Sequence, residues 1–200
     1  MIENYIFDFG NVIVKFDPDT IMKPYIKDED DRKKLSPIVF DRKNWDMLDA
    51  GAVTEEEVYE NIKNEIPEEL RKGVKATLEN WYFYLPVNNN VVDVIKTLKA
   101  NNKKVFLLSN ISRSFAEGYY RDKTLKEIFS YFEGLVFSGA EGIVKPSREI
   151  FELILSRYGL DKSCTLFIDD NIKNINSAKE LGIKTILFKS NTDAIFDFDK

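Results

Sequence analysis

Five short apolar runs are spaced along the chain, and each has the composition of a buried strand. They are rich in β-branched and aromatic residues, and none alternates regularly between apolar and polar positions. This pattern is typical of strands that are covered on both faces of a parallel sheet. The predicted strands are residues 5–9, 104–109, 134–138, 165–169 and 184–188.

Apolar residues at helical spacing lie between these runs. They predict one helix over residues 88–100, a second that contains residues 150–155 with Pro146 in its first turn, and a third that stops at Gly182. Strands that alternate with helices indicate right-handed βαβ units. We therefore expect an α/β fold in which a Rossmann-like parallel sheet is sandwiched by helices.

One long stretch, from Pro18 to Leu85, interrupts this alternation, because it is charged and contains few strand-like runs. It includes helix candidates at residues 28–34, 54–63 and 67–84, and the second of these opens on a capping-box pattern. We expect a small helical cap inserted after the first strand. The predicted domains are a core of residues 1–17 and 86–200 and a helical cap of residues 18–85, with a loosely held tail over residues 191–200.

Composition narrows the chemistry that this fold can perform. The 200 residues include no histidine and one cysteine, which excludes Ser-His-Asp and Cys-His catalysis, histidine or Cys₄ zinc sites, and a disulfide within the chain. The net charge of −5 argues against nucleic acid as a main partner. No apolar run reaches the roughly 20 residues that span a bilayer, and the N-terminus lacks signal-peptide features. We expect a cytoplasmic protein with no membrane partner, as a monomer or small homo-oligomer.

Polar residues lie where several predicted strands end. Asp8 ends the first strand, Ser109 ends the second, Asp169 and Asp170 end the fourth, and Lys145 lies in a loop before a helix. Ligands of open α/β sheets bind beyond the carboxyl ends of the strands, so these side chains could share one crevice.

The types of these residues suit a phosphate and a hard cation. Neighbouring carboxylates would repel one another unless a cation lay between them, and Mg²⁺ favours sites with one or two carboxylates and phosphate oxygens. Lys145 and Ser109 would then face the remaining anionic charge. An aspartate such as Asp8 can attack phosphorus without any histidine.

Four motifs occur in a fixed order along the chain. They are Phe-Asp-Phe-Gly-Asn-Val at residues 7–12, Leu-Leu-Ser-Asn at 107–110, Lys-Pro at 145–146, and Phe-Ile-Asp-Asp-Asn at 167–171 followed by Asn174. With these motifs the sequence resembles the haloacid dehalogenase-like (HAD) superfamily of hydrolases, which places a helical cap between its first and second motifs. The DxGNV form of the first motif is similar to a branch that includes a bacterial phosphatase acting on glucose 1-phosphate.

The resemblance implies a Mg²⁺-dependent phosphatase that forms an aspartyl-phosphate on a small phosphorylated metabolite, with a sugar phosphate as the preferred class. Asp8 would be the nucleophile, and Lys145 would neutralise its charge and that of the phosphate. The resemblance implies that Asp8, the Gly10 carbonyl and Asp170 bind the metal, and that Ser109, Asn110 and Lys145 bind the substrate. Asp169 would orient Lys145 or a metal-bound water, and Asn174 would at most support the groups that touch the metal.

Gly10 departs from the family pattern. Most phosphatases of the family carry a second aspartate there, which protonates the leaving alkoxide and then activates water, a role typically worth 10² to 10⁴ in rate. A leaving group that needs little protonation, such as an anomeric sugar oxygen, would relieve this loss. Otherwise the proton would come from water or from a cap carboxylate; Asp17, Asp46 and Asp49 are candidates, although each also fits a solvated surface charge.

Two further interpretations stay open. Metal-independent 2-haloacid dehalogenases of the family also lack the second aspartate, but they generally lack the pair that Asp169 and Asp170 form here. A non-catalytic phosphate-binding relative is the third interpretation, and the presence of all four motifs speaks against it. Trp45 and the aromatic run at residues 81–84 are interpreted as packing in the cap or at its junction with the core, with Trp45 as a possible stacking surface for a sugar.

Overall fold

A five-stranded parallel sheet forms the centre of the computed structural model, which describes residues 1–190, 192 and 195. The strand order is β3-β2-β1-β4-β5, so the chain reverses its direction of winding between β1 and β4. The predicted loose tail lies largely outside the described residues. The strands are β1 (Asn4–Phe7), β2 (Lys104–Ser109), β3 (Gly134–Phe137), β4 (Thr165–Asp169) and β5 (Lys184–Leu187).

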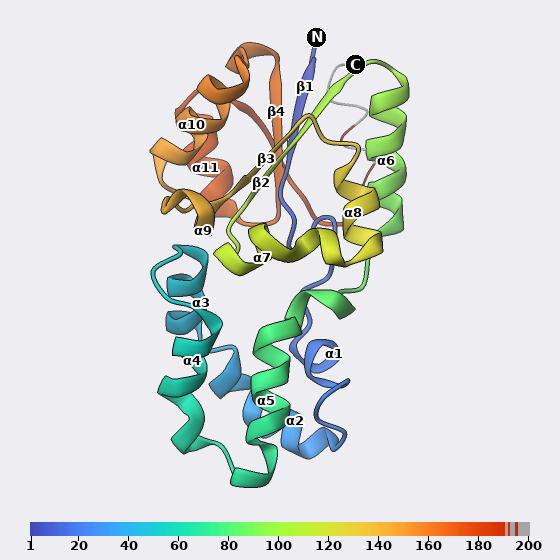
Figure 1. The fold of residues 1–200 in the computed structure, drawn as a ribbon. Coiled ribbons are helices and arrows are strands. Elements are labelled where there is room, and N and C mark those ends of the chain that lie inside the picture. Colours follow the sequence, from blue (N-terminus) through green and yellow to red (C-terminus); the bar gives the residue numbers. More distant parts are fainter. Residues whose placement is uncertain (191, 193–194, 196–200) are drawn as a thin grey trace.

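Helices cover both faces of the sheet (Figure 1). Successive residues of β1 point to opposite sides, so that Tyr5 and Phe7 belong to one apolar cluster and Ile6 to another. This explains why the strands read as continuous apolar runs. One face packs on α6 (Asn89–Ala100) and α8 (Lys123–Phe129), and the other on α10 (Arg148–Tyr158) and α11 (Ile172–Glu180).

The stretch between β1 and α6 is helical and lies beyond the carboxyl ends of the strands (Figure 1). We call residues 18–85 the helical insertion. Thr54 and Glu57 form the predicted capping box, since each accepts a hydrogen bond from the other's backbone N–H. The insertion contains α1 (Pro18–Met22), α2 (Glu29–Val39), α3 (Arg42–Asp49), α4 (Glu55–Ile62), α5 (Glu68–Asn80) and a 3₁₀ turn at Trp81–Tyr84.

The start of α10 differs from the prediction that Pro146 lies in the first turn. The helix begins at Arg148 with Ser147 as its N-cap residue, and the Lys145–Pro146 peptide bond is cis. The physical reason is that Asn110 binds both the backbone N–H and the carbonyl of Lys145, so this peptide segment is held against the β2 loop and does not join the helix. Two short helices, α7 (Arg113–Gly118) and α9 (Ser138–Glu141), complete the loops at this edge.

Among the described residues, no helix combines the length and the apolar character needed to cross a membrane.

Candidate active site

Asp8 directly follows β1, at the carboxyl ends of the strands, which we call the sheet edge, and two hydrogen bonds to backbone groups hold it there. Its N–H donates to the Ile168 carbonyl at 2.9 Å, which ties β1 to β4, and its Oδ1 accepts from the Phe9 N–H at 2.7 Å. The side chain is nearly buried. Burial raises the pKa of the Asp8 carboxyl to about 8, and the charge of Lys145 opposes that rise. A cation bound at Asp8 would favour the ionised form further.

Lys145 is the buried cation of the site. Its Nζ lies 2.8 Å from Asp8 Oδ1 and 2.7 Å from Asp169 Oδ2, and it donates to the Leu108 carbonyl at 2.8 Å. All three ammonium hydrogens therefore have acceptors. Burial alone would lower the pKa of Lys145, but Asp8 and Asp169 together raise it above its usual value. The side chain is thus a fixed positive charge between two carboxylates.

Asp169 is fully buried and both of its oxygens are engaged. Oδ2 accepts from Lys145, while Oδ1 accepts from the Asn171 N–H at 2.7 Å. The Asn174 side-chain amide lies 3.0–3.1 Å from the two oxygens. This geometry suits Asp169 to orient Lys145, with Asn174 behind it.

Asp170 lies on the open side of the same cluster. Its Oδ2 accepts from the Asn11 side-chain amide at 3.1 Å. Burial raises the pKa of Asp170 above its usual value, and the hydrogen bond from Asn11 opposes this. Carboxylate oxygens of Asp8, Asp169 and Asp170 all lie within 4.8 Å of one another, a set of hard donors that fits Mg²⁺.

Asn11 is a site residue that the sequence-based prediction passed over. It adopts a left-handed backbone conformation with φ of 56°, and its Oδ1 accepts from the Phe16 N–H at 3.2 Å. The same side chain therefore fixes the loop after β1 and points its amide at Asp170. The sequence feature that could have identified Asn11 as a site residue is its position inside the first motif, next to Gly10.

Gly10 lines the cavity and leaves space where the second aspartate of the family pattern would stand. A Cβ built at this position would meet nothing within 4 Å. The glycine is therefore not required by crowding, and the first-motif loop presents no second carboxylate to the cavity.

Ser109 is the last residue of β2 and Asn110 follows it, and the two differ in which polar groups remain for a ligand. The Asn110 side chain donates to the Lys145 carbonyl at 2.9 Å and accepts from the Lys145 N–H at 2.8 Å, so it is committed to holding that loop. The backbone N–H of Asn110 could therefore still donate to a phosphoryl oxygen. The Ser109 hydroxyl makes only a long 3.4 Å contact with the Asn110 carbonyl, so it could turn to a ligand.

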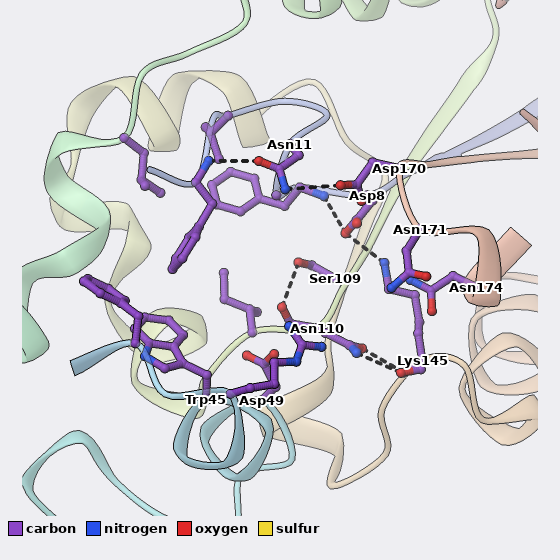
Figure 2. A pocket seen from close by; sticks show the side chains of 18 of the residues that line it. Asp8, Asn11, Trp45, Asp49, Ser109, Asn110, Lys145, Asp170, Asn171 and Asn174 are labelled. Carbon is purple, nitrogen blue, oxygen red and sulfur yellow. Dashed lines mark hydrogen bonds and ion pairs between the residues drawn. The ribbon is translucent and has the colours of Figure 1, made fainter. Parts of the chain in front are cut away.

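A cavity of about 500 Å³ lies between this cluster and the helical insertion (Figure 2). The sheet edge supplies its polar end, and the insertion with the adjoining loop supplies aromatic walls. Trp45 is buried and its Nε1 donates to the Val39 carbonyl at 3.0 Å, so the indole is fixed in place. The apolar lining on this side is Phe16, Phe40, Trp45, Trp81 and Leu85.

Only one of the three carboxylates proposed from the sequence reaches the cavity. Asp49, the last residue of α3, lines it. Asp17 instead accepts from the Thr20 hydroxyl at 2.6 Å, and Asp46 pairs with Arg42 at 2.9 Å on the exposed side of α3. The structure therefore separates Asp49 from the other two carboxylates.

The end of α3 is fastened to the core through its backbone. The Ser138 hydroxyl donates to the Asp49 carbonyl at 2.5 Å and accepts from the Ile111 N–H at 2.9 Å, so one side chain links the insertion to the loop after β2. Gly51, with φ of +66°, lies so close to Gly139 that a Cβ would stand 2.2 Å from its carbonyl oxygen. These contacts fix where the Asp49 side chain enters the cavity.

Comparison with known proteins places this fold and site in a family. A family model described as a haloacid dehalogenase-like hydrolase matches residues 2–182. The chain belongs to the haloacid dehalogenase-like hydrolases. The predicted family and the predicted α/β fold are thereby confirmed.

The relatives of this HAD-like hydrolase include phosphatases and dehalogenases. The D-ribitol-5-phosphate phosphatase of Bacteroides thetaiotaomicron is 30% identical over 203 residues, covering 96% of this chain and 95% of that protein. A HAD family enzyme of the same bacterium, solved with magnesium and inorganic phosphate, has a TM-score of 0.71 at 22% identity over 98% of this chain and 100% of its own. The L-2-haloacid dehalogenase of Xanthobacter autotrophicus has a TM-score of 0.66 at 15% identity over 92% and 76%. At these identities the two structures show a shared fold.

Proposed function

We propose that this HAD-like hydrolase is a Mg²⁺-dependent phosphomonoesterase that acts through an aspartyl-phosphate on Asp8. The observation that carries the proposal is the cluster of three carboxylates within 4.8 Å of one another, held beside the buried, charged Lys145 at the end of a cavity. Such a cluster favours a divalent cation, and a phosphate ester is the substrate that a cation, a lysine and a nucleophilic aspartate together suit.

Each residue of the cluster has a distinct part in the proposed reaction. Asp8, Asp170 and the Gly10 carbonyl would hold Mg²⁺, which when bound neutralises charge on the phosphoryl oxygens. An oxygen of Asp8 attacks phosphorus, and the bond from phosphorus to the leaving oxygen breaks. Lys145 stabilises the charge on the attacking carboxylate and the phosphoryl group. The Ser109 hydroxyl and the Asn110 N–H bind phosphoryl oxygens, while Asp169 and Asn174 keep Lys145 in place.

The proposed substrate is a small phosphorylated polyol or sugar. As its name states, the phosphatase relative from Bacteroides thetaiotaomicron acts on D-ribitol 5-phosphate. In the cavity, aromatic walls suit the C–H faces of a polyol, and Arg42 suits its hydroxyl groups. We further propose that residues 18–85 act as a cap over the cavity and exclude bulk water during turnover.

The proposed location is the cytoplasm. One cysteine in 200 residues forms no disulfide within the chain, which is the usage expected in a reducing compartment.

Metal dependence separates the phosphatase from the two other interpretations. We expect hydrolysis of phosphate esters, D-ribitol 5-phosphate and sugar phosphates among them, only with Mg²⁺ present and none after EDTA treatment, because the cation neutralises the phosphoryl charge. The measurement is release of phosphate and of halide from a panel of small phosphate esters and 2-haloacids, with and without EDTA. Halide release that EDTA leaves unchanged would establish the dehalogenase, and Mg²⁺ binding without turnover would establish a phosphate-binding relative.

The close contact between Gly51 and Gly139 allows a test of whether activity depends on the packing of the helical insertion against the core. In Gly51→Ala the Cβ meets the Gly139 carbonyl and the left-handed backbone is strained, so we expect a loss of about 1–3 kcal/mol of stability and a fall in kcat/KM of at least about tenfold. Gly142→Ala is the matched control, since Gly142 has φ of +71° but no atom within 4 Å of its Cβ position. Urea unfolding and phosphate release should show a stability loss for both variants and an activity loss for Gly51→Ala alone; equal kcat/KM would contradict the docking argument.

A further inference from the structure

A phosphate ester of an ordinary alcohol poses a problem of proton supply in this cavity. When the bond from phosphorus to oxygen breaks, the alkoxide needs a proton, and the second step needs a base to accept one from water. Gly10 has no side chain, and the chain has no histidine. The proton must therefore come from water or from another group that faces the cavity.

Elimination among the lining groups leaves one candidate. In the described part of the chain, the titratable side chains that line the cavity are Asp8, Arg42, Asp49, Lys145 and Asp170. Asp8 and Asp170 belong to the proposed nucleophile and cation site. The Lys145 hydrogens are all donated to fixed acceptors, and an arginine such as Arg42 keeps its proton at any physiological pH.

We propose that Asp49 is the general acid and base of this enzyme, supplied by the helical insertion in place of the residue missing at Gly10. This assignment rests on the proposed phosphatase function. Asp49 ends α3 and lines the cavity from the insertion side, whereas Asp8 lies at the sheet edge (Figure 2). Because attack and departure are in line at phosphorus, the leaving oxygen points away from Asp8 and toward the insertion.

The position of Asp49 is fixed by the core that holds the nucleophile. Ser138 joins the Asp49 carbonyl to the Ile111 N–H, two residues after Ser109. The close approach of Gly51 to Gly139 restrains the next turn of the chain. A proton donor on a mobile cap would lose this alignment, so the backbone link gives the carboxyl a constant place relative to the phosphoryl site.

The environment of Asp49 suits a group that must both donate and accept a proton. Burial raises the pKa of Asp49 to about 7, with Arg42 and Lys145 opposing the rise and Asp46 adding to it. Near neutral pH the carboxyl is therefore present in both protonation states in similar amounts, which is the condition for efficient acid and base catalysis.

The proton balance of the reaction is then complete. As Asp8 attacks, the electron pair of the breaking bond passes to the leaving oxygen, and that oxygen takes the proton of the Asp49 carboxyl to form the alcohol. The Asp49 carboxylate then accepts a proton from the water that attacks the phosphoryl group on Asp8. The bond from phosphorus to Asp8 breaks, and inorganic phosphate and protonated Asp49 result.

A pair of substrates that differ in leaving group tests this role in Asp49→Asn. The alcohol of an alkyl phosphate, such as the best polyol or sugar phosphate of the panel, needs protonation, whereas the p-nitrophenolate of p-nitrophenyl phosphate hardly does. We expect Asp49→Asn to lower kcat with the alkyl ester about 10²- to 10⁴-fold. With p-nitrophenyl phosphate, the rate at which Asp8 is phosphorylated is followed as the burst of nitrophenolate. We expect this rate to fall less than about tenfold. Asp30→Asn, which changes an exposed aspartate of α2 that does not line the cavity, is the matched control and should stay within about twofold of wild type on both.

The outcomes are distinct. Equal losses on the two esters would assign Asp49 a merely structural or binding role, and no loss on either would remove it from the reaction; both overturn the proposal. Wild-type protein that hydrolyses neither ester overturns the proposed function itself.

The pH dependence of kcat/KM gives a second test, and for wild type it requires no substitution. The first step requires protonated Asp49, so kcat/KM of wild type with the alkyl ester should fall as pH rises through about 7. Asp49→Asn has no such group, and its lower activity should lack this decline. Identical profiles for the two proteins would contradict the assignment.

Discussion

Asp8→Asn is expected to abolish phosphate release, with kcat at least about 10⁴-fold below wild type. The amide has no carboxylate oxygen to attack phosphorus, and it is a weaker ligand for a cation. Within the proposed reaction no neighbouring group replaces it: Asp169 is buried with both oxygens engaged, Lys145 has donated all of its hydrogens, and Asp170 is assigned to the cation.

The same variant should remain folded, which makes its loss of activity interpretable. Asparagine keeps an oxygen for the Lys145 ammonium and removes one of three neighbouring negative charges. We expect its free energy of unfolding in EDTA to equal or exceed that of wild type. Phosphate release and urea unfolding are the measurements, with Asp30→Asn on the exposed side of α2 as the control. Activity within about tenfold of wild type would show that Asp8 is not the nucleophile.

Lys145→Met is expected to give the largest loss of stability. The substitution leaves Asp8 and Asp169 buried without their shared cation, and breaking a buried ion pair from one side typically costs about 3–5 kcal/mol. We expect a decrease of this size in the free energy of unfolding in EDTA at neutral pH. Lys173→Met, which removes an exposed lysine of α11, should change it by less than about 0.5 kcal/mol.

Two conditions should recover part of this stability. Mg²⁺ binds the folded form and supplies positive charge near the two carboxylates, so it should raise the stability of Lys145→Met. The folded-state pKa of Asp8 is already raised by burial, and losing Lys145 removes an opposing charge. The pKa of Asp8 is therefore higher in the variant than the value of about 8 in wild type, and between these two pKa values Asp8 is protonated in the folded variant but not in folded wild type. Lowering the pH through this alkaline range should favour the folded variant relative to wild type. A loss under about 1 kcal/mol, unaffected by Mg²⁺, would contradict the account of this cluster.

The strands and the residues at their ends were accessible from sequence because they follow simple periodic rules. A strand covered on both faces reads as a continuous apolar run, and β1, β2 and β4 each place a polar side chain at the same edge. The short helices α1 and α3 were not predicted, because α1 has only five residues and α3 lacks the capping-box pattern that marked the equally short α4. The start of α10 was misplaced because a long-range contact, Asn110 with Lys145, decides it.

The choice among the cap carboxylates was beyond sequence reasoning for a similar reason. Asp17, Asp46 and Asp49 all read as charged residues on a helical segment. Which of them faces the cavity depends on how α3 is docked, and that is set by contacts from residues about 90 positions later, Ser138 and Gly139. Long-range packing of this kind leaves no periodic trace in the sequence.

Mass spectrometry of peptides from enzyme that is quenched in acid during turnover tests directly whether Asp8 takes up the phosphoryl group. With Mg²⁺ and a phosphate ester, we expect the added mass of one phosphoryl group on the peptide that contains Asp8, and none after EDTA treatment or in Asp8→Asn. A phosphoryl group on a different residue, or turnover with no phosphorylated peptide at any quench time, would contradict this expectation.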